Sequence, residues 1–520
     1  MRTGADYRDC LRDGREVWVM GDGPISDVTT HPATSAMVEE YVKWYDRHFD
    51  TVWEDTLLTE ADANGVRRPL AFEAPKTSDD LRALGKALNA VFSTNGGHIT
   101  HTPGYGALIA LGLLTQITGL NNSSREIEAA DLYKESIARS GRFLTYAGGG
   151  ALIGTRLRKD PRERVALQLM AETNEGIVIS GKVQMHTSTP FAEDVLITSR
   201  DELPPGSGRR LWFIVPVNAP GVRVVARRTV ARHANPFLSP LSSRFDELDS
   251  LLWLKDVFIP GERVFTGELT DRTKRHSLVS WMLWHHNHGW LAKAELTLGV
   301  ALALSEVMGL KDNPNTIEQL VDLAVDVQTS RTCLTAAELE PEMTAEGYAM
   351  PGQIHLAAAA INIFKSRQRM SEILRSLPGS SLVNAPADTD FADPVMASEL
   401  EDAFGGGGYT ALQRAGLLQL AWDQVASGLD GRESVFELHA SGGLNAWRAR
   451  LRVWFQDYDK LANGVRQLLG EDLPPMDLSS LQNVPNERPR QVTPPKRSNS
   501  LGPGPINRKP RFLKPGLFHA

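Results

Sequence analysis

The sequence predicts an α+β protein in which a β-rich region lies between two helical regions. Residues 1–155 carry apolar side chains at the three- and four-residue spacing of amphipathic helices. Residues 156–275 hold short β-branched and aromatic runs separated by Gly, Pro and Asn. Residues 276–470 return to long helical patterns, and residues 471–520 form a basic, Pro-rich tail. We expect these four segments to be the domains of the chain.

The first region contains two well-marked helices. The stretch TSDDLRALGKALNAVFSTNGG begins on a Ser/Asp cap and ends on glycines, as helices do. The stretch YGALIALGLLTQITGL is apolar on nearly all sides, so we expect it in the interior.

The middle region predicts a compact antiparallel β-barrel or β-sandwich. Its strand-like runs include GIVISGKVQMHTSTPFAEDVLITS, RRLWFIVPVN, GVRVVARRTV and LWLKDVFIPGERVF. A long polar loop at residues 198–210 joins two of these strands. A loop of that length is either filler or a lid over a site.

The last two segments differ sharply in composition. Long amphipathic patterns such as HGWLAKAELTLGVALALSEVMGL predict a helical bundle over residues 276–470. The tail is too rich in Pro, Lys and Arg to form a core. It is a tether for an acidic partner or nucleic acid, an arm across a neighbouring subunit, or a disordered segment.

Composition excludes several classes of protein. The chain has 520 residues, 42% hydrophobic and 23% charged, which is ordinary for a soluble globular protein. A net charge of −7 gives no general attraction to nucleic acid or to anionic membranes. No apolar run is long enough to span a bilayer, and the charged N-terminus is not a secretory signal. Two cysteines provide no disulfide framework, so we expect a cytoplasmic protein.

Common catalytic motifs are absent. The glycine-rich stretches at 146–150 and 404–408 lack the G-x-G-x-x-G pattern, and neither a Walker A motif nor a G-x-S-x-G elbow occurs. The histidine cluster WHHNHGW at 284–290 lacks the H-E-x-x-H pattern of zinc enzymes. We therefore expect no metal, and assign these histidines to hydrogen bonds within an interface.

Two short segments are candidates for a binding site. HTPGYG at 101–106 is a stiff, small-residue stretch that would hold His101 and Tyr105 in place. QMHTSTP at 184–190 ends one strand and opens another, and could aim hydroxyl groups at a planar polar ligand such as a flavin edge. Each segment could also be a purely structural turn.

These two segments, together with others along the chain, resemble the 4-hydroxyphenylacetate 3-hydroxylase family. Matching segments follow in order over about residues 1–460, and they cover nearly everything but the tail. They are MRTGADYRDCLRDGREVWVMGDGPISDVTTHP, HTPGYG, FLTYA, GIVISGKVQMHTSTPFAEDVLI, HHNHGWLAKAELTLGVALALSEVMG, RMSEILRSLPGSSLVNAPADTDF and SGLDGRESVFE.

The resemblance implies an acyl-CoA-dehydrogenase-like subunit with a helical N-terminal domain, a β-domain and a C-terminal four-helix bundle, usually in a homotetramer. Family members take reduced FAD or FMN from a separate NAD(P)H-dependent flavin reductase. They react with O2 through a flavin C4a-hydroperoxide and hydroxylate an aromatic substrate. The resemblance favours FAD here, because Arg432 would suit a diphosphate.

The substrate residues of the family are only partly kept. Tyr105 matches the family tyrosine that meets the substrate, whereas His101 replaces an arginine and Gly104 an aspartate. Tyr146 replaces the family histidine that binds the phenol oxygen. The resemblance therefore implies a substrate other than 4-hydroxyphenylacetate: a less acidic aromatic, a heteroaromatic or a larger biosynthetic intermediate.

The resemblance also assigns flavin contacts and a lid. Loop 198–210 corresponds to a family segment that closes over substrate. The flavin contacts are Thr187, Thr189, Thr155, Arg156, Ser427, Gly431 and Arg432.

Two other functions remain open from the sequence. One is another flavoenzyme on the same scaffold, an oxidase or dehydrogenase, which would retain FAD tightly and use a catalytic glutamate. The dehydratase branch of that scaffold needs an iron–sulfur cluster, and two cysteines cannot ligate one. The other is a degenerate, non-catalytic oligomeric scaffold.

Overall fold

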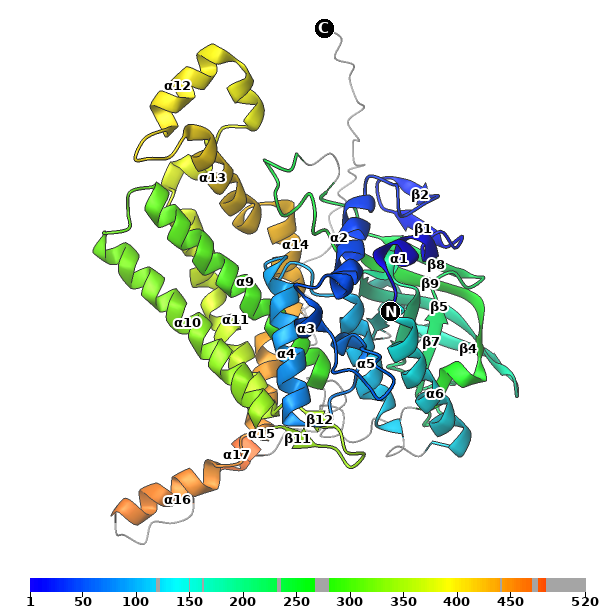
Figure 1. The fold of residues 1–520 in the computed structure, drawn as a ribbon. Helices are drawn as coiled ribbons and strands as arrows, with labels where there is room; N and C mark the ends of the chain where they lie inside the picture. Colours follow the sequence, from blue (N-terminus) through cyan, green and yellow to red (C-terminus); the bar gives the residue numbers. More distant parts are fainter. Residues whose placement is uncertain are drawn as a thin grey trace, which may run out of the picture. The chain divides into compact units, whose positions relative to one another are not determined.

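Helices and strands follow one another in the predicted order of helical, β-rich and helical regions (Figure 1). The computed structural model describes residues 1–117, 122–148, 150–160, 163–231, 235–266, 280–439, 442–469 and 476–482. Residues 1–457 form one compact unit and residues 458–520 another. Within the second unit, the described elements are α16 (Tyr458–Leu469) and α17 (Ser479–Gln482). Most of the predicted tail lies outside the described residues, and the remaining domain boundaries stay predictions.

The N-terminal region is mainly helical, as predicted. Both predicted helices form: Thr77 and Asp80 make a reciprocal cap at the start of one, and the other is buried at every position. The helices of this region are α1 (Gly4–Cys10), α2 (Ser35–Asp46), α3 (Glu54–Leu57), α4 (Ser78–Ser93), α5 (Pro103–Leu114), α6 (Ser124–Ser140) and α7 (Ile153–Arg156).

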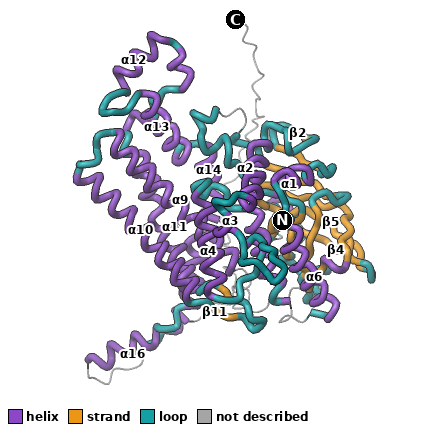
Figure 2. The backbone as a smooth tube through the Cα atoms, in the orientation of Figure 1, coloured by secondary structure: helices purple, strands orange, loops and turns teal. Residues whose placement is uncertain are grey.

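The strands form two main sheets, which Figure 2 shows gathered on one side of the long helices. The six-stranded sheet has the order β2-β1-β8-β9-β5-β4 and the four-stranded sheet the order β10-β7-β6-β3. Their bounds are β1 (Glu16–Val19), β2 (Gly23–Ile25), β3 (Leu144–Ala147), β4 (Leu167–Glu172), β5 (Gly176–Thr187), β6 (Asp194–Thr198), β7 (Leu211–Pro216), β8 (Val222–Ala226), β9 (Asp249–Pro260) and β10 (Val264–Thr266).

The β-region agrees with the sandwich alternative and departs from it in one respect. β3 contacts β5 and β7 contacts β9, so the two sheets lie against each other. Most neighbouring strands are antiparallel, but β1 pairs with β8 and β3 with β6 in parallel. Both parallel partners come from the N-terminal region, because a parallel neighbour needs a long connection rather than a hairpin.

The C-terminal region of the first unit is a helical bundle. α9 (Ser280–Val307), α10 (Pro314–Leu339) and α11 (Gln353–Ser376) pack on one another, and α13 (Ala411–Val425) packs on α9 and α11. The remaining described strands and α-helices here are β11 (Glu342–Met343), β12 (Ala349–Met350), α12 (Pro394–Phe404), α14 (Gly428–His439) and α15 (Gly443–Trp454).

Helix α5 joins the sheets to the bundle, because it contacts both β3 and α9. The HTPGYG stretch is the start of this helix: Thr102 caps it, Pro103 occupies its first turn, and Tyr105 follows within the same turn. Gly106 allows the close approach to β3, since a Cβ there would lie 1.8 Å from the Leu144 carbonyl oxygen. The chain segment with the candidate substrate residues is thus wedged between two layers.

Candidate functional site

Both backbone polar groups of His101 are hydrogen-bonded to side chains. Its backbone N–H donates to the Glu247 carboxylate at 2.5 Å, and its carbonyl accepts from the Tyr41 hydroxyl at 3.0 Å. Tyr41 also bonds the Ser188 hydroxyl at 2.8 Å, which connects this segment to the turn after β5. The His101 ring nitrogen Nδ1 lies 2.9 Å from the Thr100 hydroxyl. The imidazole is therefore held in one orientation.

The rings of His101 and Tyr105 lie together. Their centroids are 4.5 Å apart in an edge-to-face arrangement. Tyr105 stacks on His286 of α9 at 4.9 Å and lies 5.2 Å from His285. Phe436 of α14 closes the other side of His101 at 5.5 Å. The site is an aromatic cluster assembled from three helices and the loop before α5.

The other imidazoles of this cluster are buried and neutral. Burial lowers the pKa of His186 to about 4 and that of His286 to about 3, and lowers the pKa of His285 well below its usual value. Both ring nitrogens of His186 are buried and lack a hydrogen-bond partner among the described residues. The His285 ring nitrogen Nε2 contacts the Thr102 hydroxyl at 3.3 Å. The expectation that the WHHNHGW histidines hydrogen-bond within an interface stays a prediction.

A second chain of polar contacts joins α14 to the end of β5. The Arg432 guanidinium donates to both carboxylate oxygens of Asp249, at 2.8 and 2.7 Å. Asp249 also accepts from the Thr187 hydroxyl at 2.8 Å and from Arg227 at 3.0 Å. Burial alone would raise the pKa of Asp249, but the charges of Arg432 and Arg227 lower it overall. Arg432 lies 3.6 Å from Glu247, so this chain meets the one at His101.

Tyr146 projects from β3, the strand that α5 approaches. Its hydroxyl bonds the Thr198 hydroxyl at 2.9 Å, at the end of β6 and the start of the 198–210 loop. The preceding Thr145 donates to the Thr187 carbonyl oxygen at 2.8 Å. Tyr146 therefore has a polar partner in the protein, and its place beside substrate stays a prediction.

The remaining predicted flavin residues have mixed surroundings. Thr189 has a buried hydroxyl with no hydrogen-bond partner among the described residues. Ser427 caps α14, accepting from the backbone N–H groups of residues 429 and 430. Gly431 is exposed on α14, and a Cβ there would meet no atom within 4 Å. Thr155 and Arg156 lie on the short helix α7.

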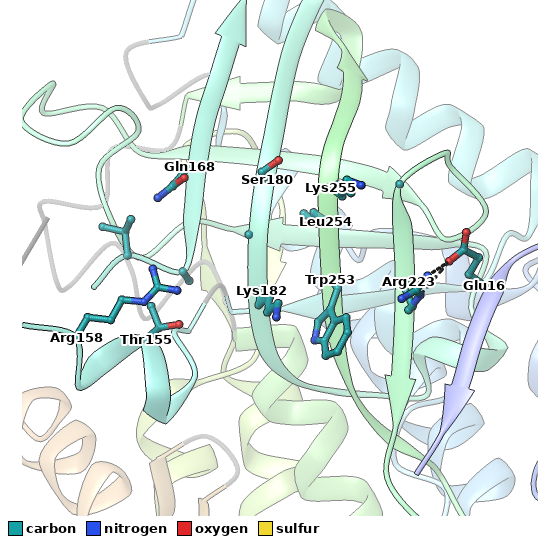
Figure 3. Close-up of a pocket in the computed structure, with 14 residues that line it drawn as sticks. Glu16, Thr155, Arg158, Gln168, Ser180, Lys182, Arg223, Trp253, Leu254 and Lys255 are labelled. Carbon is teal, nitrogen blue, oxygen red and sulfur yellow. Dashed lines mark hydrogen bonds and ion pairs between the residues drawn. The ribbon is translucent and has the colours of Figure 1, made fainter. Parts of the chain in front are cut away.

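Thr155 instead lines a separate cavity of about 630 Å³ on the outer face of the six-stranded sheet. Figure 3 shows Lys182 beside the Trp253 ring on neighbouring strands, and the ammonium lies 4.3 Å from the ring centroid. Arg158 faces them from the α7 side, and Arg223 is paired with Glu16 at 2.9 Å. The whole lining is Glu16, Thr155, Arg158, Val165, Ala166, Gln168, Ser180, Gly181, Lys182, Gly221, Arg223, Trp253, Leu254 and Lys255. The cavity is cationic overall.

The structure thus brings His101, Tyr105, Thr187 and Arg432 into one connected cluster. Thr155 lines the cavity on the six-stranded sheet instead. Two carboxylates at its centre, Glu247 and Asp249, were missed by the sequence analysis. The signal was the acidic stretch DELDS at 246–250, directly before a strongly apolar strand, where buried carboxylates require partners.

Among the described residues, no group of three or more His, Cys, Asp or Glu side chains could hold a metal ion. No helix in the part of the chain that the structure describes is both long and apolar enough to cross a lipid bilayer.

The helices and sheets together have an acyl-CoA-dehydrogenase-like fold. A solved archaeal 4-hydroxybutyryl-CoA dehydratase shares this fold, with a TM-score of 0.77 at 15% identity over 92% of this chain and 96% of that one. Family models for the 4-hydroxyphenylacetate 3-hydroxylase N terminal and C terminal regions match residues 3–266 and 271–470. The chain belongs to the 4-hydroxyphenylacetate 3-hydroxylase family, as the resemblance implied.

Relatives span most of the chain. The oxygenase component of a 4-nitrophenol 4-monooxygenase/4-nitrocatechol 2-monooxygenase from Rhodococcus opacus is 28% identical, with 90% of this chain and 91% of that protein covered. A 4-hydroxyphenylacetate 3-monooxygenase oxygenase component from Thermus thermophilus is also 28% identical, over 84% and 91%. A crystal structure of such an oxygenase component with FAD and 4-hydroxyphenylacetate has a TM-score of 0.81 and 27% identity, covering 90% of this chain and 98% of that one.

Proposed function

We propose that this protein is the oxygenase component of a two-component monooxygenase that uses reduced FAD to hydroxylate an aromatic compound. Family membership over both halves of the chain supports the reaction class. The observation that carries the proposal is the ring pair of His101 and Tyr105, held at the junction of α5, the sheets and the bundle. An oxygenase component requires a reductase, so a separate NAD(P)H-dependent flavin reductase is the proposed partner.

The aromatic cluster fits a flat substrate with a ring hydroxyl. The faces and edges of His101, Tyr105 and Phe436 suit an aromatic ring, and polar groups are few and fixed. Because His101 replaces a permanent cation of the family, the site does not depend on an anionic substrate. We propose a phenol or related heteroaromatic that is neutral in solution as the natural substrate.

The residues present fit FAD. Its diphosphate requires cations, and the cavity beside α7 provides Lys182 and Arg158 facing each other, with the Trp253 ring available to a planar group (Figure 3). The unpartnered buried hydroxyl of Thr189 would accept or donate a hydrogen bond at the ring system. When bound, reduced FAD supplies the electrons and activates O2.

We propose that Arg432 contributes to this cofactor site through Asp249. Its guanidinium fork is engaged by the carboxylate, so a diphosphate would have to compete for it. Asp249 in turn fixes the hydroxyl of Thr187, the residue that the family pattern places beside the flavin.

The proposed assembly is a homotetramer, which light scattering of the purified protein would test.

The experiment that tests the proposed function is anaerobic mixing of the full chain with reduced FAD, followed by oxygenated buffer. Reduced FAD should bind, and the bound flavin should return to its oxidised form more slowly than free flavin. Addition of a phenol such as 4-nitrophenol should yield hydroxylated product in amounts close to the flavin consumed. Product is separated by chromatography and identified by mass.

Two other outcomes would contradict the proposal. If reduced FAD oxidises in the presence of the protein at its rate in buffer, the chain is not an oxygenase component. If FAD instead copurifies tightly and is reduced by an acyl-CoA, the protein is a dehydrogenase of the same scaffold. The variant H101A should lose product formation more than affinity for reduced FAD, and equal loss of both would contradict its assignment to the substrate.

A further inference from the structure

Glu247 is a fully buried carboxylate that accepts hydrogen bonds from His101 and Thr100 and lies 3.6 Å from Arg432. Its side chain has 0% exposure. One oxygen accepts from the His101 backbone N–H at 2.5 Å, and the other accepts from the Thr100 hydroxyl at 3.0 Å and lies 3.6 Å from the His101 ring nitrogen Nδ1. Burial alone would raise its pKa, but hydrogen bonds from His101 and the charge of Arg432 lower it overall. Glu247 is therefore ionised and acts only as an acceptor.

These contacts settle which nitrogen of His101 carries the proton. The Thr100 hydroxyl has a single hydrogen, and Glu247 receives it. The 2.9 Å contact between Thr100 and Nδ1 then requires Nδ1 to donate its hydrogen to the hydroxyl oxygen. The neutral ring accordingly carries its hydrogen on Nδ1 and has its lone pair on Nε2. Within the described residues, Nε2 makes no hydrogen bond.

We infer that Glu247, together with Thr100, is a positioning residue that makes His101 Nε2 the proton acceptor for the hydroxyl of a phenol substrate. The inference rests on the proposed function. The substrate O–H gives its proton to Nε2, leaving a phenolate and an imidazolium with a hydrogen on each nitrogen. Glu247 stabilises that imidazolium from the Nδ1 side, away from the phenolate. This arrangement replaces the fixed positive charge of the family arginine with one that forms when substrate binds.

Other titratable groups around His101 cannot take this role as readily. The buried imidazoles of His186, His285 and His286 have lowered pKa values and resist protonation. Burial raises the pKa of Tyr105, so its hydroxyl stays a donor near neutral pH. The groups around His101 are Tyr105 on α5, His186 at the end of β5, Glu247 just before β9, Asp249 at the start of β9, His285 and His286 on α9, and Arg432 on α14.

The test is optical titration of bound 4-nitrophenol, whose phenolate is yellow and whose neutral form is not. Full-length protein carrying reduced FAD is mixed anaerobically with the probe, and phenolate absorbance is followed against pH. The isosteric E247Q should raise the apparent pKa of the bound probe by about one unit, a tenfold loss of phenolate at a given pH. T100V should shift it in the same direction, and T100S, which keeps the hydroxyl, should restore the parent curve.

A matched control is E338Q, which removes another buried carboxylate paired with a histidine, His288, at 3.1 Å. It should leave the probe titration unchanged, and a shift equal to that of E247Q would overturn the inference. An unchanged titration in both E247Q and T100V, with the probe still bound, overturns the role of Glu247 while leaving the proposed function intact. If even the parent protein binds reduced FAD but no phenol, both the phenol site and this inference are wrong.

Discussion

Arg432 and Asp249 form a buried bidentate ion pair that joins the bundle to the six-stranded sheet. Arg432 lies on α14 and Asp249 begins β9, 183 residues away along the chain. The arginine side chain is 8% exposed, and its charge is offset by Asp249 and by the nearby Glu247. Because Thr187 donates to the same aspartate, the pair fixes one hydroxyl at the proposed flavin site.

Removing one partner of this pair should destabilise the protein strongly. R432A leaves Asp249 buried with less charge compensation, and we expect a loss of about 3 kcal/mol in the free energy of unfolding. R432K keeps the positive charge but cannot bind both carboxylate oxygens as a guanidinium does, so its free energy of unfolding should fall less than that of R432A. Urea unfolding of both variants, of D249N and of the double variant R432A/D249N measures the coupling. Strict additivity of the two single losses would contradict a direct interaction.

The same variants distinguish two roles for Arg432. If its guanidinium binds the FAD diphosphate directly, D249N frees the fork and should strengthen binding of reduced FAD. If Arg432 acts by holding Asp249 and Thr187, as we propose, D249N and T187V should each weaken the binding of reduced FAD. Fluorescence titration with reduced FAD under nitrogen gives the affinities.

Gly431 offers a separate test of the flavin assignments. It lies within α14, and a methyl group there meets no atom within 4 Å, so G431A should stabilise the helix by about 1 kcal/mol. If flavin lies against it, the methyl group should reduce affinity for reduced FAD about tenfold or more. G464A in α16, also with no atom within 4 Å, is the matched control and should leave affinity unchanged. Unchanged affinity in G431A would remove Gly431 from the site.

Much of the fold followed from local patterns. The strands β5 to β9 coincide with β-branched runs, and α5 with a stretch that is apolar on every side, because both patterns reflect burial directly. The HTPGYG stretch begins a helix, with Thr102 as its cap and Pro103 in its first turn. The parallel entry of β1 into the larger sheet was not predictable, since a four-residue strand has no local signal for a partner 200 residues away.

The candidate site was only partly predictable. His101 and Tyr105 are four residues apart, so a single turn brings them together. Glu247 reaches His101 across 146 residues, and no spacing rule connects them. A flavin role for Thr155 came only from the family resemblance, and Thr155 lines the cationic cavity in which we place the FAD diphosphate.

The buried imidazoles should lower the free energy of unfolding as the pH becomes mildly acidic. His186 has a folded-state pKa of about 4 and His286 one of about 3, against about 6.5 for an exposed histidine. Below pH 6.5 the unfolded chain therefore binds more protons than the folded one, and stability falls as pH falls. Each imidazole should contribute about 1.4 kcal/mol per pH unit between pH 6 and 4. Urea unfolding of wild type and H186Q checks this: the variant should show a shallower slope, and equal slopes would contradict it.

The approach of α5 to β3 should tolerate no added atom at Gly106. A Cβ would lie 1.8 Å from the Leu144 carbonyl oxygen, and backbone cannot yield as a side chain can. G106A should therefore cost about 1–3 kcal/mol and push α5 from the sheet, separating Tyr105 from Tyr146. Binding of 4-nitrophenol should fall more than binding of reduced FAD, because no residue of α5 or β3 lines the cationic cavity proposed for the FAD diphosphate. G299A, a helical glycine with open space around it, is the control, and equal losses in the two variants would show that α5 does not set the substrate site.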